Sequence, residues 1–349
     1  MANGRRLRVA VNGYGVIGKR VADAVRVQDD MELAGACDVV TDWRLRVLAG
    51  KEIPLFAASS SHGEAMRAAG LDVAGELQDL LARADIVVDC TPKRIAAKNV
   101  ELYRARPIKF IVHGGEKHSV TGHSFVAEAN YAEAVGRDAT RVVSCNTTST
   151  VRTLLALKRA GLLGRARGTL LRRATDPWES HLGGIMNTLV PESEIPSHQG
   201  PDAQSVLPDL DVVTMAVKVP ETIAHLHYWV VELTREASRE EVLEAFRASS
   251  RIALINGSDG LSAINTVKEL MADIGRRHDN LYEVALWADM LKVQGSELFC
   301  AYMVDNQAIV IPETIDAIRA LTKSEPDGRR SIAQTDAALG IGRLDVLTR

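Results

Sequence analysis

Leu7-Arg8-Val9-Ala10-Val11 leads through Asn12 into Gly13-Tyr14-Gly15-Val16-Ile17-Gly18, and this stretch decides the fold of the first part of the 349-residue chain. A short apolar strand followed by glycines at GxGxxG spacing and a helix is typical of a dinucleotide-binding βαβ unit. Gly13 permits the tight turn, Gly15 lets backbone approach a pyrophosphate, and Gly18 lets helix and strand pack closely. The helix N-terminus supplies N–H donors for the phosphates. A glycine turn that binds nothing is the alternative.

The next predicted strand, residues 32–37, ends at Asp38, 20 residues after Gly18. A carboxylate at this place accepts hydrogen bonds from the ribose hydroxyls of a bound dinucleotide. It also disfavours the additional phosphate of NADP, although Arg44 lies close in sequence and partly offsets this effect. We therefore expect NAD as the cofactor, with NADP as the alternative.

Strands and helices continue to alternate in the region that follows. A buried strand over residues 85–90 runs into Thr91, and a strand over residues 109–113 runs into Gly114-Gly115-Glu116. Loops at the carboxyl ends of parallel strands line the ligand crevice of a doubly wound sheet, so we expect Thr91 and Gly115 beside the cofactor. The sequence thus predicts an α/β chain whose residues 1–144 form an N-terminal Rossmann domain with a doubly wound parallel sheet.

Longer alternating strands follow at 212–219 and 226–233, and Ser238-Arg239-Glu240-Glu241 is a capping box that opens a helix. We expect residues 145–305 to form an α+β catalytic domain with a largely antiparallel or mixed sheet. Within it, residues 176–210 lack periodicity and are rich in Pro, Ser, Gly and His, which is typical of a binding loop. Residues 306–349 are expected to form a C-terminal helical segment that returns to the Rossmann domain.

Ser144-Cys145-Asn146-Thr147-Thr148 places one cysteine in a polar, hydroxyl-rich turn. Oxidation of an aldehyde through a thioester requires a thiol near a nicotinamide ring, because the cysteine must add to the carbonyl before hydride can leave. The glycine turn and the cysteine, in this order, indicate an aldehyde dehydrogenase with two domains. An inert buried thiol is the alternative reading of Cys145.

Composition excludes few classes of protein. The formal net charge of −3 gives no indication of a nucleic-acid or anionic membrane partner. The four cysteines, at positions 37, 90, 145 and 300, have no spacing typical of a zinc site or a disulfide framework, so we expect no metal. No signal peptide or apolar stretch of membrane length occurs in the sequence, which favours the cytoplasm.

Several motifs occur in one order along nearly the whole chain. They are Asn12-Gly13-Tyr14-Gly15, Gly114-Gly115-Glu116-Lys117, Ser144-Cys145-Asn146-Thr147-Thr148, Arg172-Arg173, Pro196-Ser197-His198, Thr214-Met215-Ala216-Val217 and Ser331-Ile332-Ala333-Gln334-Thr335-Asp336. In these motifs the chain resembles the archaeal-type (type II) phosphorylating glyceraldehyde-3-phosphate dehydrogenases. The resemblance implies NAD(P)-dependent oxidation of D-glyceraldehyde 3-phosphate to 1,3-bisphosphoglycerate, a glycolytic reaction, by a cytoplasmic homotetramer.

The resemblance also implies a mechanism. Cys145 would attack the aldehyde, and a histidine would take the hydroxyl proton while hydride passes to nicotinamide, which leaves a thioester for inorganic phosphate to attack. Ala224-His225-Leu226-His227 matches the histidine motif of the family, so His225 is the expected base. His227 lies two residues along the same strand face and is expected to be structural.

Arg172 and Arg173 follow an apolar strand, so one side chain could point into the site and the other away. A solvated pair is the alternative. By the resemblance, Arg173 touches cofactor or substrate phosphate. The resemblance places Ser144, Asn146, Thr147, Arg172, His198, Gln199 and Gly200 at the substrate. The expected cofactor contacts are Gly13, Gly15, Val16, Ile17, Gly18, Asp38, Thr91, Gly115, Arg173 and Asn306.

The chain departs from the family pattern at four places. It has His198-Gln199 where two histidines are frequent and Asp305-Asn306-Gln307 where His-Gln-Glu is usual. The loop after Arg173, residues 174–179, is about one residue longer, and Ser149 and Val151 replace glycine and cysteine. Gln199 can still donate to a phosphate, and Asn306 can still pair with a carboxamide. Two alternatives therefore stay open: a paralogous cysteine-dependent dehydrogenase of another phosphorylated or acidic (semi)aldehyde, and a non-enzymatic cofactor-binding regulator.

Overall fold

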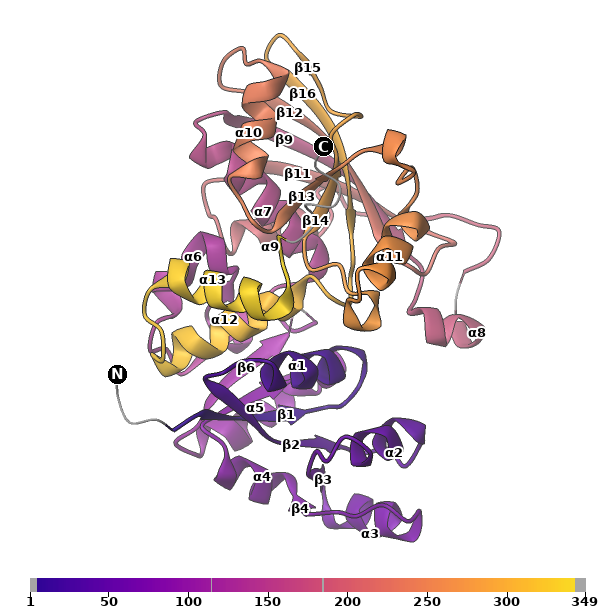
Figure 1. The fold of residues 1–349 in the computed structure, drawn as a ribbon, viewed down its shortest axis with the longest axis vertical. Coiled ribbons are helices and arrows are strands. Elements are labelled where there is room, and N and C mark those ends of the chain that lie inside the picture. The colour runs from indigo at the N-terminus through magenta and orange to yellow at the C-terminus, as the bar shows by residue number, and fades with distance from the viewer. Residues whose placement is uncertain (1–4, 114, 184, 343–349) are drawn as a thin grey trace. The chain divides into compact units, whose positions relative to one another are not determined.

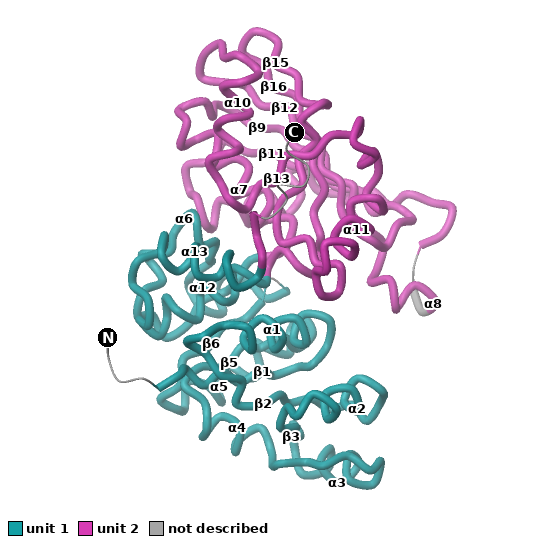
Figure 2. The backbone as a smooth tube through the Cα atoms, in the orientation of Figure 1, with its two compact units in different colours: residues 1–143, 311–339 teal, residues 144–310, 340–349 magenta. Residues whose placement is uncertain are grey.

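The computed structural model describes residues 5–113, 115–183 and 185–342. Their helices and strands are labelled in Figure 1, and they divide into two compact units (Figure 2). Unit 1 comprises residues 1–143 and 311–339, and unit 2 comprises residues 144–310 and 340–349. The chain thus leaves unit 1 directly before Ser144 and returns to it at Ile311.

Unit 1 alternates strands with helices. Its elements are β1 (Leu7–Asn12), α1 (Val16–Arg26), β2 (Met31–Asp38), α2 (Trp43–Ala49), β3 (Leu55–Ala57), α3 (Ser60–Ala68), β4 (Gly75–Glu76), α4 (Leu77–Arg83), β5 (Ile86–Asp89), α5 (Ala96–Arg104), β6 (Lys109–His113), η1 (His118–Val120), β7 (Ser124–Phe125), α6 (Ala127–Ala134), β8 (Ala139–Val142), α12 (Val310–Thr322) and α13 (Gly328–Leu339).

The strands of unit 1 form one sheet in the order β4-β3-β2-β1-β5-β6-β8-β7. All neighbouring strands in this order run parallel. The strand order reverses between β1 and β5, and ligands bind at such switch points, outside the carboxyl ends of the strands. Asn12 pairs with Asp89 at these two ends. The predicted doubly wound parallel sheet is confirmed.

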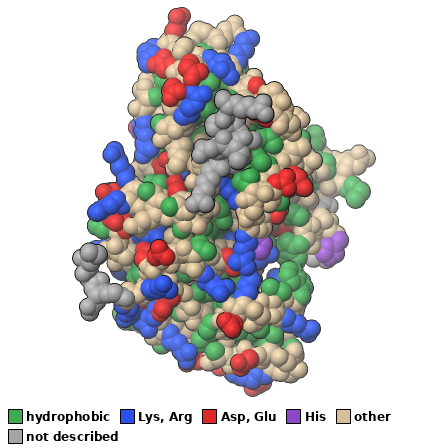
Figure 3. Space-filling model, viewed as in Figure 1, with side chains coloured by type: hydrophobic (Ala, Val, Ile, Leu, Met, Phe, Trp, Pro, Cys, Tyr) green, Lys and Arg blue, Asp and Glu red, His purple; other side chains and the backbone are tan. Residues whose placement is uncertain are grey.

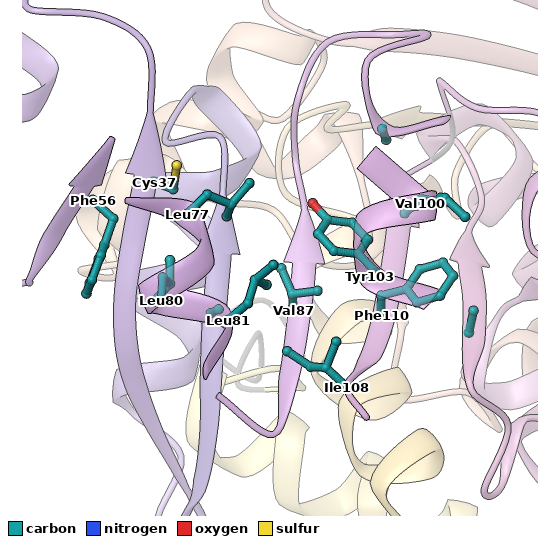
Figure 4. Packing of buried hydrophobic residues seen from close by; sticks show 14 residues of the cluster. Cys37, Phe56, Leu77, Leu80, Leu81, Val87, Val100, Tyr103, Ile108 and Phe110 are labelled. Atoms are coloured by element: carbon teal, nitrogen blue, oxygen red, sulfur yellow. The ribbon is translucent and has the colours of Figure 1, made fainter. Parts of the chain in front are cut away.

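A buried apolar cluster holds helices against this sheet (Figure 4). Leu80 of α4 and Tyr103 of α5 are fully buried in it together with Val87 of β5.

The sequence pattern from residue 75 favours a helix, but α4 begins only at Leu77. The reason is that Gly75 and Glu76 pair with β3, after which Glu76 forms a capping box.

Unit 2 is built around a second sheet. Its elements are α7 (Cys145–Arg159), β9 (Leu163–Arg173), η2 (Pro177–Glu179), α8 (Ser180–Gly183), β10 (Val190–Pro191), α9 (Gln199–Gln204), β11 (Asp211–Val219), β12 (His225–Leu233), α10 (Arg239–Arg247), β13 (Ile252–Ile255), η3 (Gly257–Asp259), α11 (Ile264–Asp273), η4 (Arg277–Asp279), β14 (Val284–Trp287), β15 (Lys292–Gln294) and β16 (Glu297–Val304).

The second sheet has the order β10-β11-β9-β12-β16-β14-β13, with β15 paired to β16. It is mixed, as expected, since β9 runs parallel to β11 and antiparallel to β12. Along β12 the side chains alternate, so His225 and His227 are buried whereas Tyr228 is 44% exposed. Helix α7 packs on β9, β14 and β16. The segment 176–210, expected to be irregular, contains η2, α8, β10 and α9.

Charged side chains of both signs are mixed on the face shown in Figure 3. This distribution agrees with the small formal charge of −3. No helix in the described part of the chain has the length and apolar character that a membrane span needs. Within the same residues, no three His, Cys, Asp or Glu side chains form a group that could hold a metal ion.

Candidate active site

Cys145 is the first residue of α7, so it lies at a helix N-terminus and not in a turn. Ser144 is the N-cap residue, and its Oγ accepts a hydrogen bond from the Thr147 N–H at 3.3 Å. The N-terminal N–H groups of a helix favour negative charge, which stabilises a thiolate relative to a thiol. The cap therefore places the sulfur where ionisation is assisted by the backbone.

His225, the first residue of β12, lies next to this sulfur although it is 80 residues away in sequence. Its Nε2 atom is 3.4 Å from Cys145 Sγ. Its Nδ1 atom accepts a hydrogen bond from the Arg173 backbone N–H at 3.0 Å. The His225 side chain is only 5% exposed, so the thiol and imidazole face one another largely shielded from water.

Burial and charge act in opposite directions on Cys145. Burial raises the pKa of its thiol above the ordinary value, whereas the charge of Arg173, the Asn146 backbone N–H and the charge of Arg172 lower it. The pKa of His225 is held well below its ordinary value, mainly by burial and further by His227 and the two arginines. Both shifts favour the neutral thiol and the neutral imidazole.

His227 has a different place in the site from His225. It is fully buried, and burial lowers its pKa to about 3. Its Nε2 lies 2.8 Å from Asn146 Oδ1, and its Nδ1 lies 3.1 Å from the Tyr302 hydroxyl. That hydroxyl also accepts a hydrogen bond from Trp229 Nε1 at 2.9 Å. This buried chain connects His227 to the side chain of Asn146, the residue that follows the nucleophile.

The two consecutive arginines are both largely buried, with side chains 22% and 14% exposed, so they are not a solvated pair. Arg173 Nη2 is 2.9 Å from Asp176 Oδ1, and Gln307 Nε2 donates to the same carboxylate oxygen at 2.6 Å. The Nε and Nη1 atoms of Arg173 are buried without a hydrogen-bond partner in the described part of the chain. Arg172 forms an ion pair with Glu192.

The other expected substrate positions differ in how free their polar groups are. Thr147 Oγ1 donates to Asp202 Oδ2 at 2.7 Å, and the Gly200 N–H donates to Thr214 Oγ1 at 3.0 Å. His198 is 62% exposed and contacts Glu192. The Gln199 carboxamide is fully buried, and neither of its polar atoms has a partner among the described residues. Buried polar groups rarely stay unpaired, so Gln199 fits a position that meets a ligand or water.

The glycine turn of unit 1 has the shape that a pyrophosphate needs. Gly13 has φ +91°, and a Cβ at this position would lie 2.9 Å from the Thr91 nitrogen. A Cβ at Gly18 would lie 1.8 Å from the Gly13 oxygen, so the helix can approach this closely only with glycine there. A Cβ at Gly15, by contrast, would meet none of the described atoms within 4 Å. Gly15 is the N-cap of α1, which starts at Val16-Ile17, and this open space fits a dinucleotide phosphate.

The other cofactor positions expected in unit 1 carry polar groups at the ends of strands. Asp38 ends β2, and its Oδ2 accepts the Tyr14 N–H at 2.7 Å, which puts the carboxylate beside the glycine turn. Arg44 is paired with Asp42. Thr91 donates its hydroxyl to Asp89 at 2.5 Å. Gly115 follows β6, while Gly114 lies outside the described residues.

Asn306, which belongs to unit 2, is also an expected cofactor contact, and its side chain is buried, with 8% of the residue exposed. Its Oδ1 is buried without a hydrogen-bond partner in the described part of the chain, and it can accept from a carboxamide N–H.

Three carboxylates at the site were not found from the sequence: Asp176, Glu192 and Asp202. Asp176 follows Arg173 at i+3 spacing, which was a usable signal for an ion pair. Glu192 and Asp202 lie 20 and 55 residues from their partners, Arg172 and Thr147. No local pattern connects residues at such separations.

Two family models match the chain. The model described as glyceraldehyde 3-phosphate dehydrogenase, C-terminal domain, matches residues 144–278, and the model described as dihydrodipicolinate reductase, N-terminus, matches residues 7–146. A glyceraldehyde-3-phosphate dehydrogenase of Archaeoglobus fulgidus is 44% identical over 97% of this chain and 99% of its own length. Those of Methanobrevibacter smithii and Thermococcus kodakarensis are each 41% identical, over 95% and 96% of this chain and 99% of their own lengths. The chain belongs to the glyceraldehyde-3-phosphate dehydrogenase family.

Proposed function

We propose that this chain oxidises D-glyceraldehyde 3-phosphate to 1,3-bisphosphoglycerate, with inorganic phosphate as the acyl acceptor. The observation that carries the proposal is the 3.4 Å approach of His225 Nε2 to Cys145 Sγ at the N-terminus of a buried helix. Two arginines beside this pair supply the positive charge that phosphorylated ligands need. The names of the relatives from three archaea support the same reaction.

Cys145 would add to the aldehyde carbon, which forms a C–S bond and a thiohemiacetal. The hydroxyl proton would pass to His225 as the hydride leaves the same carbon, so that a thioester remains. A bound nicotinamide supplies the hydride acceptor. A phosphate oxygen then attacks the thioester carbon, the C–S bond breaks and the sulfur leaves as thiolate. The side chain of Asn146, the residue after Cys145, contacts His227 through Oδ1 and would donate its amide N–H to the oxygen that becomes negative.

We also propose NAD as the preferred cofactor. Asp38 stands beside the glycine turn with a carboxylate that can accept from ribose hydroxyls. Arg44, the cation that could favour an additional ribose phosphate, is held by Asp42 through contacts of 2.5 to 3.1 Å. Gly13, Gly15, Gly18, Val16 and Ile17 would bind the pyrophosphate, while Thr91, Gly115, Arg173 and Asn306 would contact the remainder of the cofactor.

We further propose that the active form is a cytoplasmic homotetramer, as the resemblance implies. Apolar side chains on the sheet of unit 2 support self-association, since Met215, Tyr228 and Val230 are 45%, 44% and 39% exposed. Light scattering of the purified protein would measure the assembly directly, and a monomeric mass would refute it.

The substrate is tested by NAD reduction with a panel of aldehydes, each with and without inorganic phosphate or arsenate. We expect turnover with D-glyceraldehyde 3-phosphate, dependent on phosphate and supported by arsenate. Preference for a carboxylated semialdehyde would identify the alternative dehydrogenase. Cofactor binding without oxidation of any aldehyde in the panel would favour the non-enzymatic regulator.

A further inference from the structure

We propose that the Glu192 carboxylate occupies the anion pocket of Arg172 and His198 between turnovers and that a phosphate group must displace it to bind. Glu192 thereby makes the pocket selective for phosphate over carboxylate ligands. This inference rests on the proposed function, because it assumes that Arg172 and His198 bind phosphorylated ligands.

The backbone fixes Glu192 at the pocket. The residue directly follows β10, which pairs with β11, and its N–H donates to the Ala216 carbonyl at 2.9 Å. Its two carboxylate oxygens are divided between an arginine and a histidine. Oε1 contacts Arg172 Nη1, and Oε2 lies 3.4 Å from His198 Nδ1. The carboxylate therefore bridges the arginine and the histidine.

Arg172 connects this bridge to the reacting groups. It directly precedes Arg173, whose backbone N–H donates to His225 Nδ1 at 3.0 Å. The charge of Arg172 lowers the pKa of Cys145, His225 and His227. The Arg172 and Glu192 side chains are 22% and 23% exposed, so their ion pair is partly shielded from water and stronger than a surface pair. His198, at 62% exposure, leaves the other end of the bridge open to solvent. An anion can therefore approach from the His198 end and compete with Glu192.

Polar groups of Arg172 and of Gln199, the residue after His198, favour a ligand with more oxygens than a carboxylate. Both oxygens of Glu192 are used by Arg172 and His198. The Arg172 Nε atom and the Gln199 carboxamide remain buried without hydrogen-bond partners in the described ranges of the chain. A tetrahedral phosphate offers additional acceptors and a second negative charge, whereas a carboxylate ligand offers no more than Glu192 already provides. Phosphate can therefore displace Glu192, and a monocarboxylate cannot.

The test replaces Glu192 by Gln, which keeps the size of the side chain and removes its charge. Glu194→Gln is the matched control, because Glu194 is an exposed residue of the same segment. The KM values for inorganic phosphate and for the phosphorylated aldehyde are measured at constant ionic strength. We expect Glu192→Gln to lower one or both on the order of tenfold, since a competing negative charge at contact distance is removed. The KM that changes shows which phosphate the pocket binds.

A second readout needs no turnover. Alkylation of Cys145 by iodoacetamide is followed with increasing inorganic phosphate, sulfate or acetate. In Glu192→Gln, phosphate and sulfate are expected to protect Cys145 at lower concentrations than in the original chain. Acetate is expected to protect Cys145 in this variant and not in the original chain. Glu192→Ala is expected to act in the same direction, and Glu194→Gln to behave as the original chain.

Unchanged or weaker phosphate binding in both Glu192 variants, by KM and by protection, would overturn the inference and show that Glu192 instead supports Arg172. Failure of the proposed function would give a different result, namely turnover that does not depend on inorganic phosphate. The protection of Cys145 in the variants would still show whether Glu192 competes with anions.

Discussion

The Nδ1 atom of His225 accepts a hydrogen bond from the backbone N–H of Arg173 at 3.0 Å. A neutral imidazole carries one N–H, so the proton lies on Nε2, the atom 3.4 Å from Cys145 Sγ. His225 thus approaches the sulfur as a hydrogen-bond donor. To accept a proton at Nε2, the ring must give up its bond to Arg173, so base catalysis is coupled to a small change at this backbone position.

Replacing Cys145 by Ser is expected to abolish aldehyde oxidation and to leave cofactor binding nearly unchanged. The hydroxyl of serine is a far poorer nucleophile near neutral pH than the thiolate of cysteine. Steady-state rates and a fluorescence titration with NADH measure the two properties separately. Activity retained by this variant would exclude the thioester route.

Replacing His225 by Asn is expected to slow hydride transfer on the order of a hundredfold, the usual contribution of general base catalysis. His227→Asn is expected to have a much smaller effect, because His227 acts on the reaction only through Asn146. Stopped-flow measurement of NADH formation in a single turnover compares the two. A larger loss of this rate in His227→Asn than in His225→Asn would show that His227, and not His225, is the base.

The reactivity of Cys145 is expected to rise steadily with pH up to and beyond 9, since burial raises the pKa of its thiol above the ordinary value of 9.0. The thiolate is present above this pKa and is lost as pH falls below it. Arg173→Ala removes the largest contribution that lowers the pKa, so its profile is expected to shift to higher pH. Alkylation rates with iodoacetamide between pH 6 and 10 measure both profiles. An alkylation rate that is already constant at pH 7 would indicate a thiolate–imidazolium pair. This result would contradict a raised pKa of the Cys145 thiol.

Asp38→Ala is expected to weaken the binding of NAD. The ratio of kcat/KM for NAD to kcat/KM for NADP is expected to fall roughly tenfold, the effect of one charge-assisted hydrogen bond. The carboxylate both holds the ribose and repels an additional phosphate. Glu32→Ala, at an exposed position of the same strand, is the control. An unchanged ratio would place the ribose elsewhere.

Local requirements explain which features could be predicted from the sequence. The glycine turn is dictated by the backbone itself, because a Cβ at Gly18 would lie 1.8 Å from the Gly13 oxygen. The alternation of β12 could be predicted equally well, since His225 and His227 follow the period of a strand with one buried face. The helix at Cys145 was mistaken for a turn, although Ser144 followed by Thr147 has the spacing of an N-cap.

The ion pair between Arg172 and Glu192 could not be predicted. It depends on β10, a strand of only two residues, pairing with β11 across the sheet. A strand this short leaves no period in the sequence, and the surrounding segment is rich in residues typical of loops. The approach of Cys145 to His225 was expected only from the resemblance, because their separation of 80 residues gives no local signal.

The central claim, a thioester on Cys145 that waits for phosphate, is tested most directly by rapid mixing of the protein with NAD and D-glyceraldehyde 3-phosphate in phosphate-free buffer. The account predicts a burst of about one NADH per active site, with Cys145 acylated, followed by very slow turnover until inorganic phosphate is added. Sustained NADH formation without phosphate, with the free acid as product, would contradict it.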